Sequence, residues 1–152
     1  MQTGDSAPDF TAPTHDGSLL TLSALRGAPV VVYFYPKDDT PGCTTEAQDF
    51  TALGAAFAEA GARVIGVSKD TVAKHGKFAQ KHGLGVTLVS DADSDIRERY
   101  GVWGEKSNYG RTYMGITRTT VLIDAEGKVA RIWPKVRVAG HAQAVLEAVR
   151  AL

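Results

Sequence analysis

The chain has 152 residues, of which 43% are hydrophobic and 22% are charged, as in an ordinary globular protein with one hydrophobic core. Seventeen basic residues balance seventeen acidic ones, with no long run of either sign, which excludes a charged surface for nucleic acid or an acidic membrane. The first residues contain no basic segment followed by an apolar stretch, so we expect no signal peptide, no membrane span and a cytoplasmic location.

The first regular elements follow from runs of apolar residues. A nearly continuous β-branched and aromatic run over 29–35 predicts a strand buried on both faces at the centre of a sheet. From Cys43 to Ala60 the larger apolar side chains recur at helical spacing, which predicts one helix with Cys43 in its first turn. A strand over 63–68 and a helix from about Thr71 to His82, which ends at Gly83, complete a βαβ pattern.

The second half begins with a short strand near 86–89 and a helix over 93–100. The connection from 101 to 117 is rich in glycine and has few regular signals, so we expect a long loop, which is usually functional or mobile. The segments 118–123 and 129–133 flank a short connection that contains glycine, and together they predict an antiparallel hairpin.

The last segment, 142–152, has apolar residues at helical spacing and predicts a C-terminal helix. Strands that alternate with helices, followed by a hairpin and a helix, define an α/β sandwich of the thioredoxin type. We therefore expect a central mixed β-sheet flanked by helices, with an N-terminal extension. Because the chain has no internal repeat or linker, we expect residues 1–152 to form a single domain.

Cys43 is the only cysteine, which excludes an internal disulfide and leaves either an inert core residue or a reagent. A cysteine in the first turn of a helix lies near unpaired N–H groups and the positive end of the helix dipole, which favour the reactive thiolate. Gly42 lets a ligand approach the backbone, and Thr40 can direct its hydroxyl toward the sulfur. Without such neighbours, a lone cysteine is more often a small buried hydrophobe.

Residues 36–43 read P-K-D-D-T-P-G-C and match the P-x-x-x-T-x-x-C signature of the peroxiredoxin family, which this chain resembles. Together with Thr44-Thr45-Glu46, the segment is similar to the bacterioferritin comigratory protein, or peroxiredoxin Q, branch of that family. Further segments resemble the same branch, so that the similarity spans nearly the whole chain: 4–10, 100–106, 113–116 and 118–124.

The resemblance implies a role for five residues. Cys43 would be the peroxidatic cysteine, Thr40 would bind the peroxide, and Arg118 would supply positive charge beside the sulfur. Pro36 would shield the pocket, and Glu46, one helical turn after the cysteine, would orient Arg118. Taken alone, the threonine, the arginine and the glutamate each have an ordinary explanation as a helix cap, a solvated charge or a partner of the helix dipole.

Many members of this branch carry a second, resolving cysteine, either five residues after the first or near the end of the next helix. Here those positions hold Gln48 and residues such as His82 and Leu84, so the chain resembles the one-cysteine type. The resemblance implies a peroxidase that reduces hydrogen peroxide and organic hydroperoxides through a Cys43 sulfenic acid. An external thiol would recycle it: thioredoxin, glutaredoxin with glutathione, or another small thiol. The resemblance also implies a monomer. We expect no cofactor, and the balanced charge predicts no nucleic-acid or membrane partner.

Other polar and aromatic residues receive simpler interpretations. The histidines lack metal-ligand spacing, and we expect all four on the surface: His15, His75, His82 and His141. Three aromatic residues of the long connection form either a lid or ordinary packing, and we favour packing: Trp103, Tyr109 and Tyr113. Five aspartates among turn residues indicate loop and cap chemistry rather than a metal site: Asp38, Asp39, Asp91, Asp93 and Asp95.

Three other functions remain open. A peroxide sensor would be oxidised once and recycled slowly. A non-enzymatic binding module of the same fold would keep its function after Cys43→Ser. A cysteine hydrolase would need a histidine that the fold brings to Cys43, and no local motif supports one.

Overall fold

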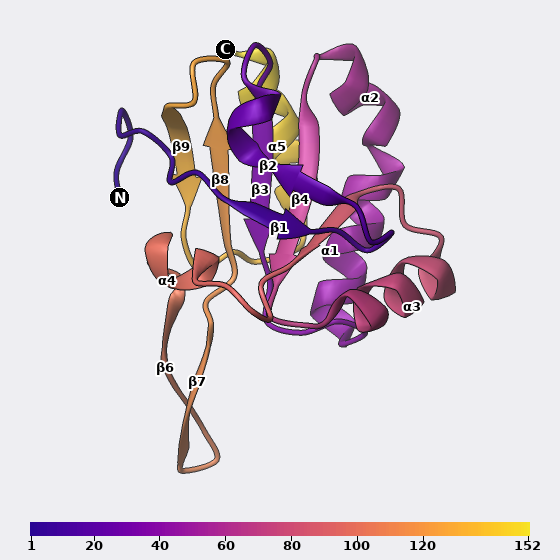
Figure 1. Cartoon of the computed structure of the whole chain (residues 1–152), viewed down its shortest axis with the longest axis vertical. Helices are drawn as coiled ribbons and strands as arrows, with labels where there is room; N and C mark the ends of the chain where they lie inside the picture. The colour runs from indigo at the N-terminus through magenta and orange to yellow at the C-terminus, as the bar shows by residue number, and fades with distance from the viewer.

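The computed structural model describes all of residues 1–152. Short strands and a 3₁₀ helix open the chain, and strands and helices then alternate (Figure 1). In chain order the elements are β1 (Thr11–Pro13), β2 (Leu19–Thr21), η1 (Leu22–Leu25), β3 (Val30–Phe34), α1 (Pro41–Ala52), α2 (Gly54–Glu59), β4 (Arg63–Ser68), α3 (Val72–His82), β5 (Thr87–Ser90), α4 (Ile96–Arg99), β6 (Trp103–Asn108), β7 (Arg111–Ile116), β8 (Thr119–Ile123), β9 (Val129–Trp133) and α5 (His141–Arg150).

A five-stranded sheet with the order β5-β4-β3-β8-β9 forms the centre of the molecule. β3 is parallel to β4, and β4 is parallel to β5, while β3 and β8 are antiparallel, as are β8 and β9. The sheet is therefore mixed, and β3 lies in its middle with all five residues buried. The predictions of a central strand over 29–35, of the βαβ unit and of the 118–133 hairpin are confirmed, as is the thioredoxin-like α/β architecture.

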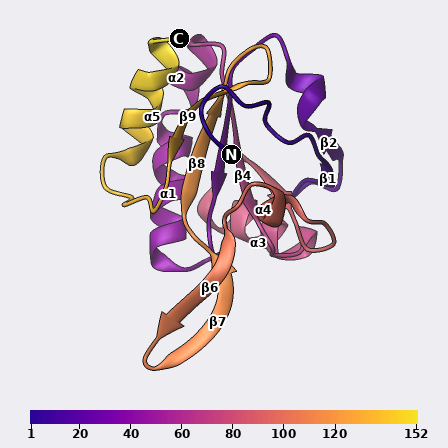
Figure 2. The same ribbon diagram turned by 90° about the vertical axis from the view of Figure 1, so that its left-hand side faces the viewer.

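Side chains that alternate along β3 enter two separate hydrophobic clusters, as the pleat of a strand requires. Val30, Val32 and Phe34 pack with the N-terminal segment and α4, whereas Val31 and Tyr33 pack with residues of α1, α2, α3 and α5. Figure 2 shows α1, α2 and α5 on one face of the sheet and the β1–β2 hairpin on the other. None of the helices combines the length and the apolar character needed to span a membrane.

The prediction of a single helix over 43–60 is wrong in one respect, because α1 and α2 are separate helices. Leu53, between them, has φ −93° and ψ 8°, which departs from helical geometry, and Gly54 follows it. Glycine is a poor helix former, so the chain can change direction there at low cost. The placement of Cys43 in the first helical turn is confirmed, since it is the third residue of α1, which begins at Pro41.

The prediction of a loop over 101–117 is wrong, because β6 and β7 pair along their whole length as an antiparallel hairpin. Tyr109 and Gly110 form its turn with φ values of 53° and 74°, which suit a tight hairpin turn and favour glycine. The hairpin projects away from the rest of the molecule (Figures 1 and 2). Tyr109 is 97% exposed and Tyr113 is 48% exposed, so the prediction that they pack against the core is wrong for both. Trp103 does pack against the core.

Candidate active site

The sheet topology brings together two segments that are far apart in sequence, the loop after β3 and the residues before β8, at one end of these two strands. β3 ends at Phe34 and leads through a loop into α1, while β8 starts at Thr119, directly opposite Phe34 in the antiparallel register. Arg118, which precedes β8, therefore lies beside the start of α1. A backbone hydrogen bond from the N–H of Val136 to the carbonyl of Arg118, 2.9 Å long, holds this end of the strand.

Cys43 is buried, with 1% of its surface exposed, and Arg118 is the only side chain that hydrogen-bonds its sulfur. Nη2 of Arg118 lies 3.3 Å from Sγ. A second nitrogen of the same guanidinium, Nη1, donates to Oε1 of Glu46 at 2.7 Å. Glu46 and Cys43 are three residues apart on α1 and therefore share one helix face, so both can contact the same guanidinium.

Glu46 is 1% exposed, and its second carboxylate oxygen, Oε2, has no hydrogen-bond partner. Burial raises the pKa of Glu46 from 4.5 to about 7, although the charge and hydrogen bond of Arg118 lower it. Burial would lower the pKa of Arg118, but the charges of Glu46 and Cys43 outweigh burial and raise it. The guanidinium therefore remains a fixed positive charge at the sulfur.

Thr40, Pro36 and Gly42 lie on the loop and first turn that carry Cys43. Thr40 is the residue before α1, but its hydroxyl does not cap the helix; it donates to the carbonyl of Lys37 at 2.8 Å. Pro36 is half-buried and lies two residues after the end of β3. A Cβ on Gly42 would lie 3.2 Å from Nη2 of Arg118, closer than most real contacts, so glycine is what lets the guanidinium approach here.

Two of the four histidines expected on the surface are buried, so that prediction is wrong for His75 and His141. His141 begins α5, and its Nε2 lies 2.8 Å from the hydroxyl of Thr120. Burial, with the nearby charge of Arg118, lowers the pKa of His141 to about 4, so this ring is neutral at neutral pH.

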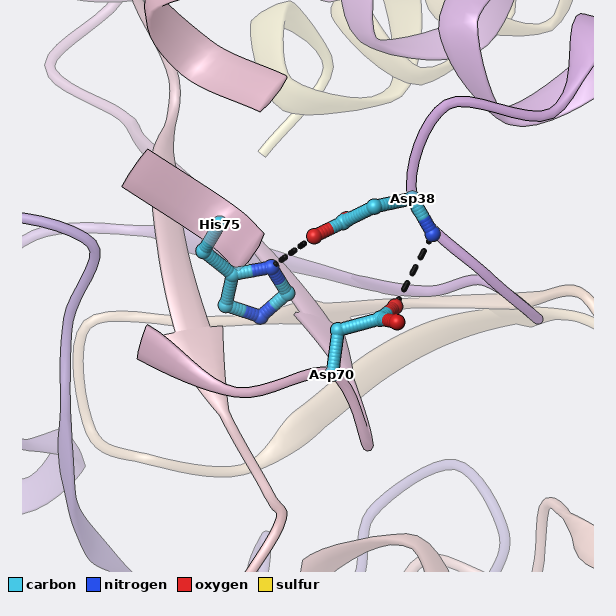
Figure 3. A group of neighbouring side chains, drawn as sticks. All are labelled: Asp38, Asp70 and His75. Carbon is cyan, nitrogen blue, oxygen red and sulfur yellow. Dashed lines mark hydrogen bonds and ion pairs between the residues drawn. The ribbon is translucent and has the colours of Figure 1, made fainter. Parts of the chain in front are cut away.

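His75 belongs to a buried group that sequence reasoning missed, with Asp38 and Asp70 (Figure 3) and with Tyr35, whose hydroxyl donates to Asp38. Asp38 is therefore more than a loop aspartate, because its carboxylate is a partner of His75 at 2.6 Å. The helical period could have revealed His75, which lies three residues before the buried Phe78 and so on the same helix face. Asp91 does act as a cap, since its carboxylate accepts from the N–H groups of residues 96 and 97 at the start of α4.

Cys43 lies in the first turn of a helix, and its sulfur contacts a guanidinium at the end of a thioredoxin-like sheet. This arrangement is typical of thiol-based oxidoreductases. The sequence matches the model of the AhpC/TSA family over residues 3–132. It is 50% identical to the peroxiredoxin Bcp of Xanthomonas campestris pv. campestris, with 97% of this chain and 96% of that protein covered. It is 45% identical to the peroxiredoxin Bcp of Bacillus subtilis, with 99% and 96% covered.

Solved structures agree with this assignment. A structure of the Xanthomonas campestris bacterioferritin comigratory protein superposes with a TM-score of 0.91 at 44% identity, covering 99% of this chain and 96% of that one. Peroxidoxin BcpB of Mycobacterium tuberculosis gives 0.88 at 38% identity, covering 100% and 98%. The chain therefore belongs to the AhpC/TSA family and to its Bcp, or peroxiredoxin Q, branch, and it is a thiol-dependent peroxidase with a single cysteine.

Proposed function

We propose that Cys43 is the peroxidatic residue and that it reduces hydrogen peroxide and organic hydroperoxides. The observation that carries this proposal is the pair of contacts made by Arg118, 3.3 Å to the sulfur and 2.7 Å to Glu46. A guanidinium fixed by a carboxylate on one side stabilises negative charge on the sulfur and on the peroxide oxygen that leaves when the O–O bond breaks. Glu46 acts as the positioning residue for this guanidinium.

In the proposed reaction, the Cys43 thiolate attacks one peroxide oxygen, so that an S–O bond forms and the O–O bond breaks. The sulfur is oxidised to a sulfenic acid, and the peroxide is reduced to an alkoxide or hydroxide that takes up a proton to become an alcohol or water. Arg118 stabilises the charge that develops on the leaving oxygen. Pro36 and Gly42 complete the site, Pro36 by covering it and Gly42 by admitting the guanidinium.

Thr40 orients the peroxide in this scheme. Its hydrogen is already used in the 2.8 Å bond to the Lys37 carbonyl, so the oxygen faces a ligand only as an acceptor. An organic hydroperoxide has one O–H donor and hydrogen peroxide has two, so each can donate to that acceptor. The proposed contact would therefore fix which oxygen of the substrate the sulfur attacks.

The second half of the proposed cycle uses a thiol from outside the chain, because Cys43 is the only cysteine. The external thiolate attacks the sulfenic acid to form a mixed disulfide and water, and a second thiol releases Cys43. Thioredoxin and glutaredoxin with glutathione are the candidate reductants. A monomeric, single-domain protein in the cytoplasm, where such thiols are reduced, is consistent with this cycle.

The test measures the oxidation rate of Cys43 directly. Pre-reduced protein is mixed with hydrogen peroxide or an alkyl hydroperoxide and quenched with an alkylating agent, and Cys43 is followed by intact mass beside free cysteine. We expect oxidation orders of magnitude faster than free cysteine, and a loss of about 100-fold in Arg118→Ala. Turnover with thioredoxin or glutaredoxin identifies the reductant.

Two outcomes would contradict the proposal. A sulfur that reacts no faster than free cysteine would show that Cys43 is not the peroxidatic residue. Fast oxidation that neither reductant reverses would favour a sensor over a scavenging enzyme. Arg131→Ala is a matched control, since that arginine lies on β9 against Trp133 and does not contact Cys43.

A further inference from the structure

Asp38, Asp70 and His75 form a cluster next to the loop that leads to Cys43 (Figure 3). They come from three segments: the loop before α1, the residues after β4, and α3. All three are buried, and His75 is 0% exposed. One ligand atom from each lies within 4.8 Å of the others, close enough for a metal ion, but the atoms that face one another already bond within the protein. The cluster is therefore an internal hydrogen-bond network.

The side chain of Asp38 is held by two partners. Its Oδ1 accepts from the hydroxyl of Tyr35 at 2.6 Å, and its Oδ2 lies 2.6 Å from Nδ1 of His75. Nε2 of His75 lies 3.0 Å from the carbonyl of Val89, which can only accept, so Nε2 carries a proton. The helix α3 and the end of β3 thus fix the position of Asp38 in the loop.

The backbone of Asp38 is held as well. Its N–H donates to Oδ2 of Asp70 at 2.9 Å, and the hydroxyl of Ser68 donates to the same oxygen at 2.6 Å. The carbonyl of Lys37 belongs to the same peptide unit, and it accepts the hydrogen of Thr40. Because the peptide is planar and trans, its N–H and C=O point in opposite directions. Asp70 and Thr40 therefore form hydrogen bonds to opposite ends of one peptide unit.

We infer that Asp38, Asp70 and His75 are positioning residues for the peroxide-binding hydroxyl of Thr40. They hold the Lys37–Asp38 peptide so that its carbonyl keeps the Thr40 hydrogen and the Thr40 oxygen remains an acceptor for the substrate. A carboxylate at the N–H end also polarises the peptide and strengthens its carbonyl as an acceptor. This inference rests on the proposed function, because it assigns the cluster to the same peroxide reaction.

The test compares two reactions of Cys43 in Asp70 variants of the full chain. One is oxidation by hydrogen peroxide, which uses Thr40, and the other is alkylation by iodoacetamide, which does not. In Asp70→Ala we expect the rate constant for oxidation to fall by about 10- to 100-fold, because the substrate contact is misplaced. The alkylation rate constant should be little changed, since the contact of Arg118 with the sulfur is intact.

Asp70→Asn is the conservative variant, which keeps an acceptor oxygen but loses the charge. We expect its oxidation rate to lie between those of the wild type and Asp70→Ala, about fivefold below the wild-type value, because a neutral acceptor binds the N–H of Asp38 more weakly. It also carries the test if Asp70→Ala does not fold. The matched control is Asp93→Asn, an exposed loop aspartate, which should oxidise at the wild-type rate.

The outcomes separate this inference from the proposed function. If the wild-type protein is oxidised much faster than free cysteine and the Asp70 variants are oxidised at the same rate as the wild type, the inference is overturned and the proposed function stands. Oxidation and alkylation that fall by the same factor would also overturn the inference, since that pattern shows a general loss of loop structure. A wild-type protein no faster than free cysteine would refute the proposed function itself, and the inference with it.

Discussion

Replacing Glu46 with glutamine should change how the stability of the protein depends on pH. Burial raises the pKa of Glu46 from 4.5 to about 7 in the folded protein, with partial opposition from Arg118. Between these values the folded protein binds more protons than the unfolded chain, so the free energy of unfolding decreases as the pH rises. The stabilising contribution is fully present below about pH 4.5 and is lost through about pH 7, and the difference between the two pKa values corresponds to about 3 kcal/mol.

The assay is urea unfolding of the wild-type protein and of Glu46→Gln at a series of pH values from about 4 to 8, on either side of the predicted window. Glutamine has nearly the same shape and keeps an acceptor for Arg118, but it does not titrate. The unfolding free energy of the wild type minus that of the variant should therefore fall by about 3 kcal/mol across the window. A difference that stays constant or rises with pH would refute the reasoning that burial dominates the protonation of Glu46.

Three further substitutions test the packing and the hydrogen-bond network. In Gly66→Ala a Cβ would lie 2.6 Å from the ring of Tyr33 in the neighbouring strand, and we expect urea unfolding to show a loss of about 1–3 kcal/mol. In His75→Leu, Asp38 loses its buried partner, and we expect a loss of about 3–5 kcal/mol and a lower thermal unfolding temperature. Tyr109→Ser, at the exposed hairpin turn, should change the unfolding free energy by less than about 0.5 kcal/mol.

Matched variants make these three results specific. Gly104→Ala lies on β6, where a Cβ would meet nothing within 4 Å, so it should be tolerated, and equal losses at Gly66 and Gly104 would contradict the argument from close contact. Lys74→Leu changes an exposed position on the same helix as His75 and should cost little. A large loss in Tyr109→Ser would mean that the hairpin turn packs against another surface.

Local patterns were sufficient to predict the features that lie closest to Cys43. The β3 run is apolar on both faces because it is buried on both, and this burial is visible in the sequence as an unbroken series of hydrophobic residues. The start of α1 is marked by Pro41 at its first position, which is typical of helix N-termini. Arg118 was predicted beside the sulfur only through the resemblance, since its 75-residue separation from Cys43 depends on how β8 pairs with β3.

The features that were not predicted have little or no local signal. β6 and β7 are mostly exposed, so neither strand shows the alternation of apolar and polar residues that burial on one face produces. The polar partners of His75 come from the loop before α1 and from β5, far from it in sequence. The hydrogen-bond partners of a buried polar residue are brought together only in the folded chain, so the sequence around His75 can indicate its burial but not its partners.

The burial of Cys43 places a condition on the proposed recycling step. Cys43 is 1% exposed, and a disulfide requires two sulfur atoms about 2 Å apart, so in the proposed cycle the first turn of α1 has to open before a protein thiol reaches the sulfur. That turn has no side-chain cap, since the hydroxyl of Thr40 donates to the carbonyl of Lys37, and its backbone hydrogen bond runs from the N–H of Thr44 to the carbonyl of Thr40 at 2.9 Å. The proposed attack on the peroxide uses the closed turn, in which Arg118 lies 3.3 Å from the sulfur. The proposed oxidation step therefore requires the first turn of α1 to be closed, whereas the proposed recycling step requires it to be open.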